Sequence, residues 1–70
     1  MPLTFAEKNK TYRIAKITGK DEVRHHLSEL GFHEDESITL KQAIDGNLIV
    51  EIKGVRIALS DKLAKRIQIG

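Results

Sequence analysis

The chain contains no cysteine among its 70 residues. Disulfide bonds, zinc fingers and thiolate iron sites are therefore excluded, and any metal would have to be bound by histidine, aspartate or glutamate. Aromatic residues are also scarce, because there is no tryptophan, one tyrosine and two phenylalanines. Aliphatic side chains must therefore form most of the hydrophobic core.

Long hydrophobic runs are absent as well, so no segment approaches the length that crosses a membrane. The first residues lack the charged and then apolar pattern of a signal peptide. We therefore expect a cytoplasmic protein without membrane insertion. A chain of 70 residues buries one small core, which predicts a single domain over residues 1–70 and no enzyme active site.

The charges are nearly balanced, with twelve basic and ten acidic residues and a net charge of +2. This excess is too small to predict nucleic-acid binding, and few aromatic side chains are available to stack on bases. No nucleic-acid partner is expected. A small nucleic-acid-binding barrel stays an alternative because several basic residues could form one patch: Lys41, Lys53, Arg56, Lys65 and Arg66.

Alternating apolar and polar residues predict several short β-strands. Residues 11–18 are rich in β-forming side chains, and their pattern slips near Ala15, which predicts a bend or bulge there. Residues 37–44 place four side chains on one face: Ile38, Leu40, Gln42 and Ile44. Asp45-Gly46 predicts a two-residue hairpin turn. The returning strand has a second apolar face, made of Leu48, Val50 and Ile52.

Beyond this hairpin, Gly54 is expected to break the ladder before another alternating segment, residues 55–59. Ser60 is predicted to cap a single helical turn from Asp61 to Lys65. A last short strand follows at residues 67–69.

One short helix is predicted between the first two strands. Asp21 is the expected N-cap, and Val23, Leu27 and Leu30 are spaced to form one apolar stripe. Gly31 fits the left-handed residue that ends a helix, and Phe32 is expected to fold back over the last turn. Leu30 and Phe32 are both expected to cap the core.

Five short antiparallel strands would leave exposed edges unless they closed on themselves. The predicted fold class is therefore mainly β, a small SH3-like barrel of about five strands. One short α-helix lies between strands 1 and 2, and a short helical turn precedes the last strand. An OB-type barrel is the second choice, since a helix between its first two strands is less typical.

The order of these segments resembles the FeoA family, a group of small proteins and domains associated with ferrous iron uptake. The matching segments are Tyr12-Arg13-Ile14-Ala15-Lys16-Ile17, Val23-Arg24-x-x-Leu27-x-Glu29-Leu30-Gly31-Phe32, Ile38-Thr39-Leu40, Gly54-Val55-Arg56-Ile57-Ala58-Leu59 and Ala64-x-x-Ile67. The sequence departs from the family pattern in three places. Glu34-Asp35 replaces a usual Pro-Gly, the hairpin connection is shortened to Asp45-Gly46, and Ser60 replaces a common basic residue.

The resemblance implies an SH3-like barrel that is not an enzyme and acts beside FeoB, the membrane ferrous iron transporter with a cytosolic GTPase domain. It implies binding to the cytosolic part of that transporter. The expected oligomeric state is a monomer or a weak homo-oligomer. A direct metal-binding regulatory domain is a further alternative, with weakly bound Fe(II) or another divalent transition metal.

Two candidate sites follow from the residues. Glu22, His26 and Glu29 lie four and three residues apart on the predicted helix, where two carboxylates and an imidazole could hold a divalent metal. Solvated helix acids beside a histidine are the simpler interpretation. The expected partner-binding residues lie on the exposed side of the helix and the outer face of the hairpin: Arg24, His25, Ser28 and Ile49.

Overall fold

The computed structural model describes all 70 residues of the chain. Its elements, in chain order, are the 3₁₀-helix η1 (Leu3–Phe5), β1 (Thr11–Ile17), α1 (Asp21–Glu29), β2 (Ser37–Ile44), β3 (Asn47–Ile52), β4 (Val55–Ser60), α2 (Asp61–Ala64) and β5 (Ile67–Ile69). Neither α-helix is long and apolar enough to cross a membrane.

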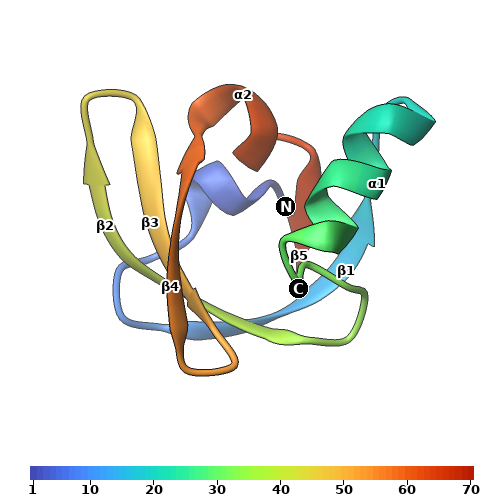
Figure 1. Ribbon diagram of the computed structural model, residues 1–70. Helices are drawn as coiled ribbons and strands as arrows, with labels where there is room; N and C mark the ends of the chain where they lie inside the picture. Colours follow the sequence, from blue (N-terminus) through green and yellow to red (C-terminus); the bar gives the residue numbers. More distant parts are fainter.

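The five strands form one antiparallel sheet in the order β4-β3-β2-β1-β5. This sheet curls into a small barrel, and α1 stands at the side of β1 and β5 (Figure 1). The two edge strands, β4 and β5, do not pair with each other. The mainly β fold with its two short helices is therefore as predicted.

The core inside the curled sheet is entirely apolar, and no polar or charged residue is buried. Every strand contributes to it, together with η1, α1, α2 and the segment after α1. Its thirteen members are Leu3, Ile14, Leu27, Phe32, Ile38, Leu40, Leu48, Val50, Ile52, Leu59, Ala64, Ile67 and Ile69. Packing of aliphatic side chains therefore stabilises the fold, as the composition indicates.

Two β-bulges shape the sheet. The β1–β5 register shifts between Ile14 and Lys16, which confirms the bulge predicted near Ala15. A second shift between Leu40 and Gln42 makes Lys41 an extra residue opposite β3. One extra residue exchanges the two faces of a strand. The prediction that Gln42 and Ile44 share the buried face of Leu40 is therefore wrong, and Ile44 is 45% exposed.

Two-residue turns connect β2, β3 and β4. Asp45 and Gly46 have φ angles of 48° and 78°, so the predicted hairpin turn is confirmed. Lys53 and Gly54 have nearly the same angles, 52° and 78°. Ile52 pairs directly with Val55, so Gly54 belongs to a second tight hairpin and β4 runs back along β3.

The start of α1 differs from the prediction. Lys20 is the N-cap residue and makes no side-chain hydrogen bond, while Asp21 is the first helical residue. The Asp21 carboxylate forms an ion pair with Arg24 instead of capping the helix. In the first turn it also faces the positive end of the helix dipole, so it stabilises the helix from a different position.

The end of α1 is a Schellman motif. Gly31 adopts a φ of 104°, the Gly31 N–H donates to the Ser28 carbonyl at 3.0 Å, and the Phe32 N–H donates to the Leu27 carbonyl at 3.0 Å. The predicted helix stop is confirmed. Phe32 is fully buried, whereas Leu30 remains 37% exposed, so the expectation that both cap the core holds for Phe32 alone.

Helix α2 begins at the predicted cap, where the Leu63 N–H donates to Ser60 Oγ at 3.3 Å. Replacing Ser60 by alanine removes this acceptor, which costs about 1 kcal/mol of unfolding free energy at a typical N-cap. In a domain of this size we expect the melting temperature to fall by roughly 4–8 °C. Thermal unfolding followed by circular dichroism measures the shift. Ser37→Ala, at an exposed strand position, should leave the melting temperature unchanged, and equal shifts for both variants would contradict the role of the cap.

Candidate functional site

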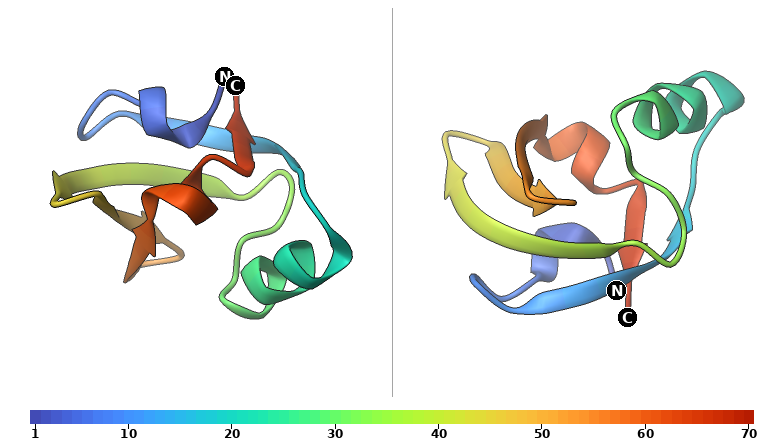
Figure 2. Two further views of the ribbon diagram at one scale, coloured as in Figure 1. Left: turned by 90° about the horizontal axis from the view of Figure 1, so that it is seen from above. Right: turned by 60° about the horizontal axis from the view of Figure 1, so that its bottom comes forward.

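The predicted partner-binding residues lie on two separate parts of the molecule. Arg24 and His25 are exposed on α1, and Ser28 is half-buried on the same helix. Ile49 lies on the outer face of β3, opposite Gln42 on one side and Ala58 on the other. Both views of Figure 2 place α1 and β3 at opposite sides of the barrel. The structure therefore brings together the three helix residues but not Ile49.

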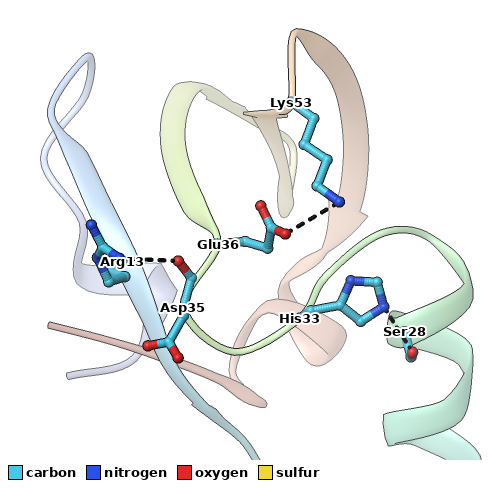
Figure 3. A network of polar contacts seen from close by, with 6 residues as sticks. All are labelled: Arg13, Ser28, His33, Asp35, Glu36 and Lys53. Carbon is cyan, nitrogen blue, oxygen red and sulfur yellow. Dashed lines mark hydrogen bonds and ion pairs between the residues drawn. The ribbon is translucent and has the colours of Figure 1, made fainter.

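The segment from His33 to Glu36 joins the exposed side of α1 to the barrel (Figure 3). His33 Nε2 lies 3.0 Å from Ser28 Oγ, which ties the segment to the helix. The backbone of Ile14 in β1 clamps its other end. The Asp35 N–H donates to the Ile14 carbonyl at 2.8 Å, and the Ile14 N–H donates to the Glu36 carbonyl at 2.9 Å.

Two long side chains add further contacts to this segment. Arg13 Nη1 donates to the Asp35 carbonyl at 3.5 Å, and Lys53 Nζ lies 3.2 Å from Glu36 Oε1. Asp35 itself has a φ of 71°, a left-handed conformation that aspartate tolerates. The segment is therefore held by α1, by β1 and by the turn between β3 and β4. We call α1 and residues 33–36 together the helix–loop surface.

The helix–loop surface is acidic although the whole chain is basic. Residues 20–36 contain two basic and six acidic residues, a net charge of −4 with neutral histidines. The rest of the chain has ten basic and four acidic residues, a net charge of +6. Within the surface, Arg24 pairs with Asp21, and His25 Nε2 lies 2.8 Å from Glu29 Oε1. Most of the remaining carboxylates face solvent.

The candidate metal ligands are not assembled into a metal centre. The structure has no group of three or more histidine, aspartate or glutamate side chains placed to hold an ion. Glu22 and His26 are exposed on α1, and the Glu29 carboxylate pairs with His25 rather than with them. The helical spacing puts the three residues near one another, but the Glu29 carboxylate contacts His25, one turn earlier in the helix.

Sequence reasoning missed the contacts that hold residues 33–36. Arg13 and Lys53 lie far from this segment in the sequence, and their side chains show no pattern that separates them from other surface cations. The acidic run from Glu34 to Glu36 was the only visible signal. The barrel also has no pocket, so the candidate site is a surface.

The fold and this surface define a small SH3-like barrel with one helix between its first two strands. A zinc complex of FeoA from Stenotrophomonas maltophilia, described as a prokaryotic SH3 domain protein and a candidate ferrous iron transport activating factor, superimposes with a TM-score of 0.86. It is 22% identical in sequence, and the match covers 100% of this chain and 89% of that one.

The chain belongs to the FeoA domain family, whose sequence model matches residues 1–69. The crystal structure of an iron uptake regulatory protein, FeoA, is 25% identical, with a TM-score of 0.90 and coverage of 99% of this chain and 92% of that one. A manganese-dependent transcriptional repressor is 17% identical, with a TM-score of 0.88, and the match covers 99% of this chain but 40% of the repressor. A sequence comparison with curated proteins gave no match.

These findings confirm the resemblance seen in the sequence motifs and the SH3-like fold. The chain is therefore a member of the FeoA domain family, and one structural neighbour from that family is described as an iron uptake regulatory protein. The FeoA domain is a small accessory domain and not a known enzyme family.

Proposed function

We propose that this domain binds the cytosolic part of a FeoB-type membrane ferrous iron transporter in the cytoplasm and modulates its activity. The observation that carries this proposal is the helix–loop surface, a rigid and acidic feature on a barrel whose family serves ferrous iron transport. Arg24, His25 and Ser28, the helix residues expected to bind a partner, lie on this surface.

The anchoring of residues 33–36 supports a role in binding. A segment tied to α1, β1 and the β3–β4 turn is already ordered before a partner arrives. Binding therefore costs little conformational entropy. A flexible acidic loop would bind its partner more weakly, because the conformational entropy lost on ordering the loop would offset part of the binding free energy.

The charge of the surface indicates the chemistry of its partner. A net charge of −4 over residues 20–36, against +6 elsewhere, orients the domain toward a basic surface. Opposite charges at such an interface raise the association rate and disfavour docking of the basic side of the barrel. We therefore expect a cluster of lysine or arginine side chains where the transporter's cytosolic part receives this domain.

The test is binding of the isotopically labelled domain to the cytosolic part of a FeoB-type transporter, followed by NMR and calorimetry. We expect amide shifts confined to residues 21–36. Glu34→Lys, at an exposed position, should weaken binding about tenfold, or roughly 1.4 kcal/mol, because it reverses one charge at the interface. Glu7→Lys makes the same charge change in the exposed loop before β1, and it should leave the affinity unchanged.

Other outcomes would contradict parts of the proposal. Loss of binding in Ile49→Lys but not in Glu34→Lys would move the docking face to the outer side of the sheet. Absence of any binding to the transporter domain would overturn the function itself. Salt-dependent binding of RNA or DNA in its place would favour the nucleic-acid alternative.

A further inference from the structure

Strand β4 is an uncovered edge of the sheet. The other edge strand, β5, is covered by the start of the chain. The Met1 ammonium group donates to the Ile69 carbonyl at 3.0 Å, the Ile69 N–H donates to the Met1 carbonyl at 2.7 Å, and Pro2 forms a bridge with Gln68. No segment lies in the same way along β4.

The backbone of β4 has unused hydrogen-bonding groups on its outer side. In a two-residue hairpin the residues that flank the turn, here Ile52 and Val55, form a hydrogen-bonded pair, and such pairs then alternate along the ladder. Arg56 and Ala58 consequently direct their N–H and C=O groups away from β3. None of the backbone hydrogen bonds outside the ladders involves either residue.

The side chains of β4 do not protect this edge. Val55 is 56% exposed and Ile57 is half-buried, both on the inner side of the strand. The pairing of β4 with β3 is regular and has no bulge, and the strand contains no proline. Its one charged residue, Arg56, is engaged with Glu51 at 3.7 Å. Natural edge strands usually carry several of the protective features that β4 lacks.

We propose that β4 pairs antiparallel with β4 of a second copy of this chain, which joins two barrels through one continuous sheet. With the two-fold axis at Ile57, Arg56 lies opposite Ala58 of the second copy. Both residues direct their backbone groups outward, so each of the two equivalent pairs exchanges two hydrogen bonds. Ile57 then lies beside Ile57 of the second copy, and Val55 beside Leu59.

A second copy is the occupant that this edge fits best, because the arrangement is self-complementary in charge as well as in hydrogen bonding. The same register brings Lys53, at one end of β4, next to Asp61 of the second copy at the other end. Both side chains are more than half exposed in the single chain, at 59% for Lys53 and 51% for Asp61, so each can approach the second copy while it stays near its partner in the same chain, Glu36 for Lys53 and Lys65 for Asp61. Contact through one strand buries less than the roughly 1,200 Å² of a standard interface. We therefore expect a weak dimer, with a dissociation constant above the micromolar range.

Sedimentation and NMR of the labelled domain at increasing concentration test this pairing. We expect the average mass to rise toward the dimer across the micromolar to millimolar range. The Arg56 and Ala58 amides should then gain protection from hydrogen exchange, whereas the Ile57 amide, already bonded to β3, stays protected at every concentration.

Val55→Lys should keep the domain monomeric, because it places a charge against Leu59 of the second copy. Ile44→Lys, at another exposed apolar position of the sheet, should dimerise like the parent chain.

A second variant tests the hydrogen bonds directly. Ala58→Pro removes the outward N–H of Ala58 and leaves the bonds toward β3 intact, a change that edge strands tolerate. It should abolish the dimer, and circular dichroism should show that the barrel remains folded. A mass independent of concentration would overturn the proposal. So would a dimer that survives Val55→Lys, or concentration-dependent shifts outside residues 53–61.

Discussion

Replacing Phe32 by alanine is expected to unfold most of the domain at room temperature. Phe32 is fully buried and is the largest side chain of the core. Removing a buried phenylalanine costs about 3–5 kcal/mol, because the apolar contacts are lost and the cavity closes only in part. A single core of this size rarely supplies more than about 3–5 kcal/mol in total. Urea denaturation followed by circular dichroism measures the loss.

Leu30 provides the matched control for this variant. It lies two residues before Phe32 at the end of the same helix, but it remains 37% exposed. Leu30→Ala should therefore cost less than about 1 kcal/mol, as expected for a partly exposed site. Similar denaturation midpoints for the two variants would contradict the assignment of Phe32 to the core.

The second large effect concerns the start of the chain. Leu3 in η1 is fully buried, although it precedes the first strand by several residues. Leu3→Ala should lower the free energy of unfolding by about 2–5 kcal/mol, the range for buried leucines. The loss should be accompanied by faster hydrogen exchange at Ile69, whose N–H donates to the Met1 carbonyl. Chemical denaturation and amide exchange together measure both effects.

Phe5, two residues later in the same short helix, is the control for Leu3. It is 72% exposed, so Phe5→Ala should change stability by less than about 0.5 kcal/mol. If Leu3→Ala were equally mild, residues 1–5 would not be part of the core. The pair therefore distinguishes a structural start of the chain from a peripheral one.

The two buried residues also differ in their relation to the proposed docking surface. Phe32 directly precedes residues 33–36, so its loss should release the helix–loop surface as well as destabilise the barrel. Leu3 belongs to η1, which contacts α2 and β5. A mild variant at Leu3, such as Leu3→Met, should leave partner binding unchanged.

Local sequence signals predicted the elements whose geometry depends on neighbouring residues. Asp45-Gly46 adopts the positive φ angles of a two-residue turn, which both residue types tolerate. Gly31 ends α1 because glycine, which has no Cβ atom, adopts the left-handed conformation required there without a steric penalty. The alternation of Leu48, Val50 and Ile52 predicted a buried face, and all three are buried.

Predictions failed where a contact with a neighbouring side chain or a shift in strand register overrode a local preference. Ile44 leaves the core face because an extra residue at Lys41 changes the register against β3. Asp21 pairs with Arg24 rather than capping α1. Glu29 contacts His25, one turn earlier, and the metal site at Glu22, His26 and Glu29 stays a prediction. A helical or strand period states which side chains share a face. It does not indicate which neighbouring group each side chain contacts.

The sequence by itself therefore determined the order of the five strands and the two α-helices, the Asp45-Gly46 turn, the aliphatic character of the core and the family. These properties depend on residue types and short spacings, which the chain carries wherever it is placed. The tertiary structure alone decided how residues 33–36 are anchored, that Ile49 lies far from α1, and that β4 is an open edge while β5 is covered. Those facts arise from contacts between segments far apart in the chain, and no local pattern encodes them.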